Sequence, residues 1–191
     1  MQTIMLFFGI IVGLAVMGLV LWWSVLYHQF GLIFNRSSHF PTKYSVGPPD
    51  GPPVTLVVMG DSTAFGTGAS SLQATFPCQV AQHLASGKRH VQVINLAVVG
   101  ARLADVVQKQ FPAVQRLHPT YVVISVGAND ATHFTSKTEY RQSLYELMTG
   151  LRRLTGCTVA IANPPDMGVV PALPYPYRWS VARRAQWLND A

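Results

Sequence analysis

Four short, mainly apolar runs divide the chain after position 53, and each leads into a loop that carries glycine or small polar residues. The first run, 54–59 (VTLVVM), is rich in β-branched side chains and stops at Gly60. Continuous apolar runs of this length are typical of strands that are buried on both faces of a sheet. The pattern therefore predicts strands at 54–59, 90–96, 121–126 and 158–162.

The stretches between these runs carry apolar residues at helical spacing. In the second stretch, Val106, Val107 and Phe111 are expected to face the sheet, while Pro112 predicts a break or kink. Strands that alternate with helices predict a parallel, doubly wound sheet between two layers of helices. Helices are predicted at 73–86, 103–117, 138–154 and 179–190.

A much longer uncharged run, 4–27, lies near the start of the chain. As a helix it would be about 36 Å long, which exceeds the roughly 30 Å of a hydrocarbon core. The alternative is a cleaved signal peptide, but no Lys or Arg precedes the run and no small-x-small cleavage site follows it. The sequence therefore predicts a single-pass membrane anchor over residues 1–28, followed by a linker over 29–53.

The linker prediction rests on composition, because 41–53 (PTKYSVGPPDGPP) holds five prolines and two glycines. Such a segment cannot sustain a helix or an inner strand. Residues 54–191 are then expected to form one domain.

Charge and cysteine content argue against nucleic-acid binding and against a cysteine-ligated metal site. The net charge of +6 arises from few acids, with only 12% of residues charged, and the arginine pairs at 152–153 and 183–184 fit solvated helix faces. No nucleic-acid partner is expected. Cys78 and Cys157 have no neighbours with metal-ligand spacing, so free thiols are expected, with a disulfide between them as the alternative.

Small polar residues follow three consecutive predicted strands. Ser62 follows the first strand, Gly100 follows the second, and Asn129 follows the third. Serine also caps helices in such turns, so Ser62 alone indicates little. Together, however, the three residues suit attack on an acyl carbon, because a tetrahedral oxyanion needs preset N–H donors. Glycine lets the backbone approach closely, and asparagine donates without adding charge.

At these positions the chain resembles the SGNH (GDSL-type) hydrolase family. Residues 60–62 (Gly-Asp-Ser) match the first family block, Asn95 with Gly100 the second, and 127–130 (Gly-Ala-Asn-Asp) the third. Thr63 replaces the leucine of the family's short signature. The resemblance covers about 54–191 and implies a three-layer α/β/α, flavodoxin-like fold.

The resemblance also implies roles for single residues. Ser62 would be the nucleophile, and the oxyanion hole would consist of the Ser62 N–H, the Gly100 N–H and the Asn129 amide. Asp61 and Asp130 would support the turns, and no metal or organic cofactor is implied. The substrate would be an acyl ester of a lipid, a small acyl compound or an acetylated glycan.

The family's Asp-x-x-His block, which lies in a later segment, has no match before Ala191. The last strand and the general base are therefore expected to be missing, and this form is expected to be inactive. Asp130 and His133 do form an Asp-x-x-His pattern, which we interpret as chance. His133 is thus the weakest candidate for the base.

The sequence thus predicts a membrane-anchored serine esterase, with the cell envelope as its expected location and the side of the membrane left open. One alternative is a non-catalytic binding module on the same fold. A nucleotide-binding flavodoxin-like domain is a further alternative, but Gly66-Thr67-Gly68 lacks the third glycine of the dinucleotide fingerprint.

Overall fold

The computed structural model describes residues 2–35, 40–154, 156–162, 164–170, 173 and 175–190, and within 2–35 it describes side chains at 7, 9–25 and 28. The chain divides into two units, residues 1–36 and 37–191. Each unit is described by itself.

The first unit is one helix, α1 (Gln2–Asn35). Among the helices and side chains that the structure describes, none combines the length and the apolar character that a membrane crossing needs. The membrane-spanning helix predicted over 4–27 is therefore not confirmed. Positions 4–6, 8, 26 and 27 of that prediction lie outside the described side chains.

The second unit is built on a mixed sheet, whose described strands follow the order β1-β3-β2-β4-β5. Four strands are parallel, while β1 runs antiparallel to β3. The prediction of a purely parallel sheet is therefore wrong at one edge. An antiparallel edge strand on an otherwise parallel sheet is common in α/β folds. The strands are β1 (Lys43–Val46), β2 (Pro53–Gly60), β3 (His90–Asn95), β4 (Tyr121–Ser125) and β5 (Thr158–Ala162).

Strand β1 lies inside the segment that was predicted to be a linker. Tyr44 and Val46 are half-buried and pack against the core between the sheet and α3. Prolines flank β1 without entering it, and they are tolerated because β1 lies at the edge of the sheet. A proline-rich composition therefore correctly excluded an inner strand but did not exclude an edge strand.

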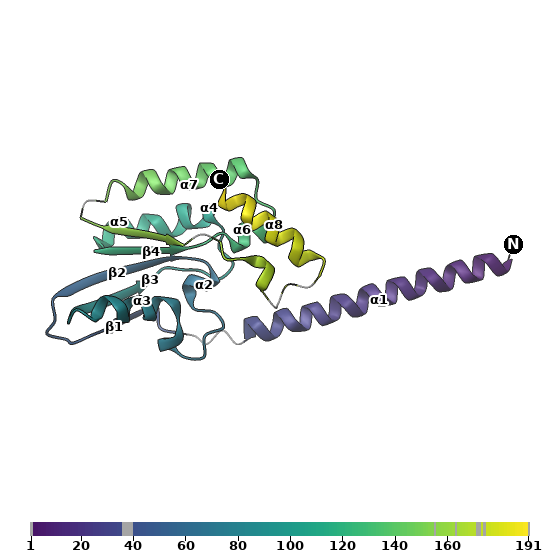
Figure 1. Cartoon of the computed structure of the whole chain (residues 1–191), viewed down its shortest axis with the longest axis horizontal. Helices are drawn as coiled ribbons and strands as arrows, with labels where there is room; N and C mark the ends of the chain where they lie inside the picture. Colours follow the sequence, from purple (N-terminus) through teal and green to yellow (C-terminus); the bar gives the residue numbers. More distant parts are fainter. Residues whose placement is uncertain are drawn as a thin grey trace. The chain divides into compact units, whose positions relative to one another are not determined.

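Helices cover both faces of the sheet, with α3 on one face and α4, α5 and α7 on the other (Figure 1). Pro77 lies in the first turn of α3, where its missing N–H costs no hydrogen bond. The predicted helix at 103–117 is divided into α4, a π-helical turn η2 and α5. The remaining bounds are α2 (Ser62–Phe65), η1 (Leu72–Ala74), α3 (Phe76–Ala85), α4 (Leu103–Asp105), η2 (Val106–Gln110), α5 (Phe111–Leu117), α6 (Ala128–Thr132), α7 (Lys137–Leu151), η3 (Met167–Val169) and α8 (Tyr177–Asn189).

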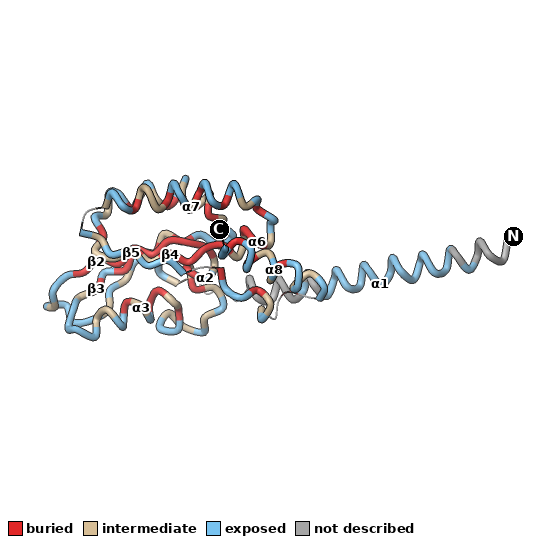
Figure 2. The backbone as a smooth tube through the Cα atoms, turned by 45° about the horizontal axis from the view of Figure 1, so that its top comes forward, coloured by how far each residue is buried: buried red, intermediate tan, exposed pale blue. Residues whose placement is uncertain are grey.

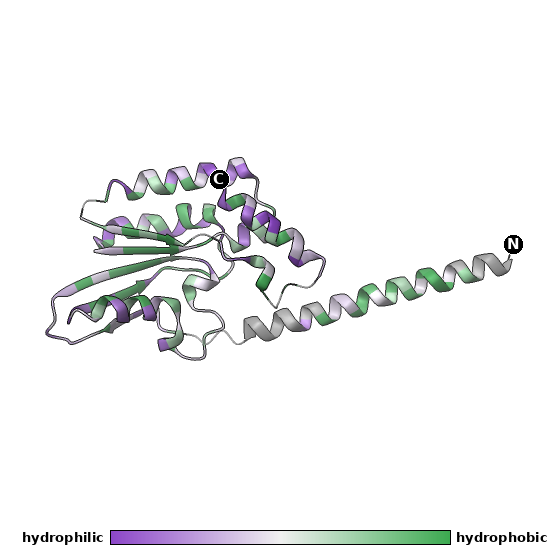
Figure 3. Ribbon diagram, in the orientation of Figure 1, coloured by the Kyte–Doolittle hydropathy of each residue, from purple (hydrophilic) through white to green (hydrophobic). Residues whose placement is uncertain are grey.

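The core lies along β2, which has a neighbouring strand on each side (Figure 2). Its run 56–59 is fully buried, in line with the continuous apolar run in the sequence. The strands carry the most hydrophobic part of this unit, whereas the helices alternate between hydrophobic and hydrophilic positions (Figure 3). Burying one valine or leucine side chain contributes about 1.5–3 kcal/mol, so the strand that leads to Ser62 is the best anchored in the sheet.

Candidate active site

The carboxyl ends of β2, β3 and β4 lie side by side, and β2 is the middle strand. The register pairs Val58 of β2 with Asn95 at the end of β3, and Gly60 at the end of β2 with Ser125 at the end of β4. The three loops that follow these strands therefore leave the sheet at one edge. In open α/β sheets this edge is where ligands bind.

Ser62 is the first residue of α2, directly after β2. Asp61 is the N-cap, and its carboxylate accepts a hydrogen bond from the Thr63 N–H at 2.9 Å. The Asp61 N–H donates to the Ser125 carbonyl at 3.0 Å and so joins the turn to β4. Asp61 is thus the capping residue, and the Ser62 side chain stays half-buried, with no hydrogen bond to Oγ among the described residues.

The loop after β3 is attached to α2 through Asn95. Its Nδ2 donates to the Ala64 carbonyl at 3.0 Å, and its Oδ1 accepts from the Ala97 N–H at 3.0 Å. Gly100 ends this loop with φ +85°, a left-handed backbone that favours glycine, and it is exposed. Asn95 therefore ties the Gly100 loop to the helix that carries Ser62.

Asn129 and Asp130 connect the loop after β4 to the same Gly100 loop. The Asn129 Nδ2 donates to the Ala101 carbonyl at 3.0 Å, and the Asp130 carboxylate accepts from the Leu103 N–H at 2.9 Å. One hydrogen of the Asn129 amide remains available, because an amide nitrogen carries two. Asn129 thus lies against the residue that follows Gly100.

Two buried carboxyls lie behind this edge. Burial raises the pKa of Asp61, and the negative charge of Asp130 acts in the same direction, although the Thr63 N–H opposes the shift. Burial also raises the pKa of Asp130, against the Leu103 N–H. Burial, with Asp130 and Asp61 nearby, raises the pKa of Tyr140 to about 12. Each of the three groups therefore gives up its proton less readily in the folded protein than in water.

These shifts predict a pH dependence of stability. A carboxyl whose folded pKa exceeds the ordinary value of 3.8 binds its proton more tightly in the native state. The free energy of unfolding should therefore fall as the pH rises from about 4 through the raised values. Asp61→Asn and Asp130→Asn, whose amide oxygens can still accept the same N–H groups, should each make this fall shallower in urea unfolding across pH 4–8.

Asp105 provides the control of opposite sign. Its hydrogen bond with Lys109, at 2.7 Å, lowers its pKa, so its contribution is present above the ordinary pKa and is lost as the pH falls. Asp105→Asn should therefore leave the fall above pH 4 unchanged. The prediction would be contradicted if Asp61→Asn and Asp130→Asn left the dependence of the unfolding free energy on pH unchanged.

His133 lies on this edge but points to the backbone. It caps the C-terminus of α6 and is exposed, with Nδ1 2.8 Å from the Asn129 carbonyl oxygen and 3.2 Å from Thr132 Oγ1. His90 begins β3, and His118 follows α5 near the start of β4, so both lie at the opposite end of the sheet. Among the described residues, no imidazole is hydrogen-bonded to Ser62.

The structure confirms that Cys78 and Cys157 are free thiols. Within the described part of the chain, no three His, Cys, Asp or Glu side chains gather closely enough to hold a metal ion.

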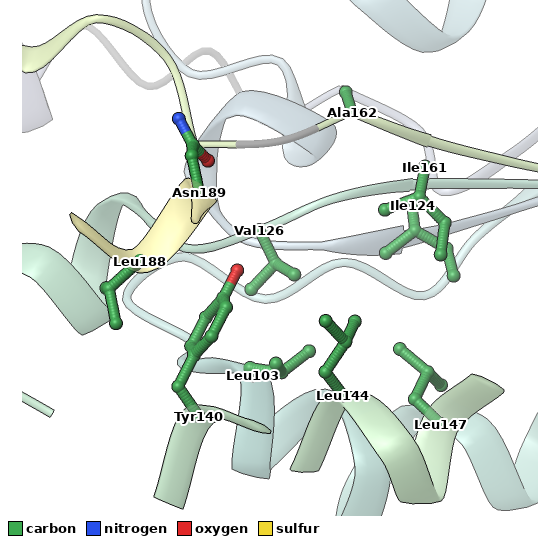
Figure 4. Close-up of a pocket in the computed structure, with 10 residues that line it drawn as sticks. All are labelled: Leu103, Ile124, Val126, Tyr140, Leu144, Leu147, Ile161, Ala162, Leu188 and Asn189. Carbon is green, nitrogen blue, oxygen red and sulfur yellow. The ribbon is translucent and has the colours of Figure 1, made fainter. Parts of the chain in front are cut away.

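Two hollows lie near the candidate residues. One, of about 180 Å³, is lined by Gly100 and includes Val98, Val99 and Lys109. The other, of about 50 Å³, is apolar, and leucines of α7 face isoleucines of β4 and β5 across it (Figure 4). Because none of Ser62, Gly100 and Asn129 lines the apolar cavity, we interpret it as loose core packing and assign it no part in the site.

Sequence reasoning missed Gln110. Its side chain is only 3% exposed and hydrogen-bonds both polar groups of Gly60, at 2.8 and 2.9 Å. Val106 and Val114, four residues before and after it, are fully buried. A glutamine in the middle of an apolar helical stripe was the available signal, because a buried amide needs a polar partner.

The chain is similar in sequence to proteins of one known family. The GDSL-like lipase/acylhydrolase family matches residues 58–191. The GDSL-like esterase Rv1075c of Mycobacterium tuberculosis is 35% identical over 128 residues, which are 65% of this chain and 40% of that protein. This chain thus covers less than half the length of that curated relative.

Solved structures share the fold, TesA and Axe2 among them. TesA superposes with a TM-score of 0.54 at 22% identity, over 71% of this chain and 73% of that one. Axe2, an acetylxylan esterase from Geobacillus stearothermophilus, does so with a TM-score of 0.54 at 17% identity, over 73% and 72% of the two chains. At these identities the likeness concerns the fold.

Proposed function

Since this chain belongs to the GDSL-like lipase/acylhydrolase family, we propose that it hydrolyses acyl esters with Ser62 as the nucleophile. The observation that carries the proposal is the contact between Asn129 and the Gly100 loop, in which Nδ2 lies 3.0 Å from the Ala101 carbonyl oxygen. This contact joins the loops that follow β3 and β4, the two strands beside the one that leads to Ser62, and these loops carry two of the proposed oxyanion donors.

The proposed reaction has two halves. The Ser62 oxygen attacks the acyl carbon while a base takes its proton, and the resulting oxyanion accepts hydrogen bonds from the Ser62 N–H, the Gly100 N–H and the free hydrogen of the Asn129 amide. The tetrahedral species then releases the alcohol, which takes up a proton, and leaves an ester on Ser62. Water attacks this ester and releases the acid, which restores the hydroxyl.

The substrate class that we propose rests on the family and on the space beside Gly100, a hollow that Gly100 lines and that Ser62 and Asn129 do not. Hollows that hold drug-sized ligands are about 300–1,000 Å³, whereas the hollow beside Gly100 is about 180 Å³. We therefore propose an ester with a small group on this side of the site. A lipid ester or an acetylated glycan would place its remaining bulk outside the hollow.

Covalent labelling tests the proposal. An alkyl fluorophosphonate, which phosphonylates activated serines, should modify Ser62 in the folded protein, with the site read by mass spectrometry of peptides. His133→Ala should be labelled within about two-fold of the wild-type rate, because its Nδ1 faces the Asn129 carbonyl and no contact with Ser62 is present among the described residues.

Two results would count against this assignment. Labelling of another serine in folded protein, or of none, would contradict the assignment of Ser62 as the nucleophile. Loss of labelling in His133→Ala, with an unchanged circular dichroism spectrum, would make His133 the base and would overturn our interpretation of the Asp130–His133 pattern as chance.

A second candidate function is a non-catalytic binding module on the same fold. The observation that favours it is that, among the described residues, no imidazole is hydrogen-bonded to Ser62. The release of alcohol from a small ester distinguishes the two candidates. An esterase releases the alcohol, whereas a binding module would bind the ester or its acid without hydrolysing the ester.

A further inference from the structure

The peptide groups at the end of β2 lose their neighbouring strand just before Ser62. The last register pair of β2 with β3 joins Val58 to Asn95, two residues before Gly60. Residues two apart in a strand direct their N–H and C=O groups to the same side. The N–H and C=O groups of Gly60 therefore point to the side on which β3 has already ended. Because a buried N–H must be hydrogen-bonded, the Gly60 N–H needs a partner other than β3.

Gln110 supplies that partner. Its Oε1 accepts the Gly60 N–H at 2.8 Å, and its Nε2 donates to the Gly60 carbonyl at 2.9 Å. The Gly60 carbonyl also accepts the Val98 N–H at 3.1 Å. One side-chain amide thus satisfies both the donor and the acceptor of a single residue, as a neighbouring strand would do.

The helix that carries Gln110 is distorted at this position. Residues Val106–Gln110 form the π-helical turn η2, between α4 and α5. Single π turns are rare and occur frequently at functional sites. Because Val106 and Val114 are fully buried, Gln110 occupies a position that faces the sheet, in line with the strand end that leads to Ser62.

We propose that Gln110 is a positioning residue for the reaction of Ser62. By holding both polar groups of Gly60, it sets the plane of the peptide that leads into Asp61 and so orients the Ser62 hydroxyl and N–H together. Gln110 does not touch the substrate in this proposal. The inference rests on the proposed function, because the geometry matters only if Ser62 attacks an acyl carbon.

Two substitutions of Gln110 distinguish a role in orienting Ser62 from a role in packing the core. Gln110→Met keeps a similar length and volume but removes both hydrogen bonds. Gln110→Glu keeps the shape and an acceptor, and it regains a donor only when its carboxyl is protonated. Misplacement of a reacting group by about 1 Å can lower a rate about 100-fold, so we expect kcat to fall about 10- to 100-fold in Gln110→Met, with KM within about three-fold.

The glutamate variant adds a pH signature. At pH 8 its carboxylate repels the Gly60 carbonyl, whereas at lower pH the protonated carboxyl can accept and donate as the amide does. The ratio of its kcat to that of the wild type should therefore rise as the pH falls from 8 to 5. A purely structural role predicts no such recovery of kcat in molecules that are already folded.

Thr120→Val is the matched control. It removes the 3.3 Å hydrogen bond from the Thr55 N–H to Thr120 Oγ1, which also joins a side chain to the backbone of β2 but at the opposite end of the strand. The variant should lose stability and keep kcat within about two-fold. All variants are compared at temperatures at which circular dichroism shows them to be folded.

Hydrogen exchange measures the clamp without any need for turnover. The Gly60 amide should be protected in the wild type and exchange at least about ten-fold faster in Gln110→Met, while Thr120→Val leaves it unchanged. Unchanged exchange, or a normal kcat in Gln110→Met, would overturn the inference. If the wild-type protein neither turns over esters nor is labelled at Ser62, the proposed function fails, even when exchange confirms the clamp itself.

Discussion

Replacing Ser62 by alanine is expected to lower kcat for a short-chain ester by about 10⁴- to 10⁶-fold in protein whose general base is in place, because removal of a catalytic nucleophile has effects of this size when the base is present. The change deletes only a half-buried hydroxyl that makes no hydrogen bond among the described residues. Stability should therefore change by no more than about 0.5 kcal/mol. The measurement is initial-rate hydrolysis of a nitrophenyl ester, with circular dichroism and urea unfolding in parallel.

Ser71→Ala provides the matched control. Ser71 lies nine positions later and caps η1, where its hydroxyl oxygen accepts the Ala74 N–H at 3.3 Å. Its loss should cost about 1 kcal/mol and leave kcat within about two-fold. A Ser62→Ala protein that hydrolyses esters at the wild-type rate would contradict the proposed nucleophile. A wild-type protein that binds such esters without any turnover would favour the binding module.

Replacing Gly60 by alanine is expected to destabilise the fold by about 4 kcal/mol or more, which is large for one methyl group. A Cβ at this position would lie 1.9 Å from the Ser125 carbonyl oxygen and 2.8 Å from its carbon. These are backbone atoms of the paired strand β4, so they cannot move aside as a flexible side chain could. The φ of +139° adds strain for any residue other than glycine.

Gly68→Ala is the control that distinguishes the two effects in Gly60→Ala, the close contact of the new Cβ with β4 and the strain of a positive φ. Gly68 has a φ of +86°, but no atom lies within 4 Å of the position that its Cβ would take. This variant should lose only about 1–2 kcal/mol, which is the cost of a left-handed backbone. Urea unfolding of both variants measures the difference, and equal losses would show that the approach of β4 to Gly60 contributes nothing.

The sequence by itself determined the elements that local patterns control. Short runs rich in apolar and β-branched residues predicted β2, β3, β4 and β5 within about one residue, because a strand buried on both faces needs a largely apolar stretch. The same alternation placed Ser62, Gly100 and Asn129 at one edge of the sheet. That inference needs only parallel strands, whose carboxyl ends lie together.

Only the tertiary structure decided which distant segments pair. The edge strand β1 has four residues of mixed polarity, and its antiparallel direction depends on contacts with β3 almost fifty positions later, which no local pattern encodes. The clamp between Gln110 and Gly60 joins residues fifty positions apart for the same reason. Local sequence sets the backbone preference and the burial of each residue. The hydrogen-bond partner of the Gly60 N–H depends instead on the tertiary structure, because the pairing of β3 with β2 ends two residues before Gly60.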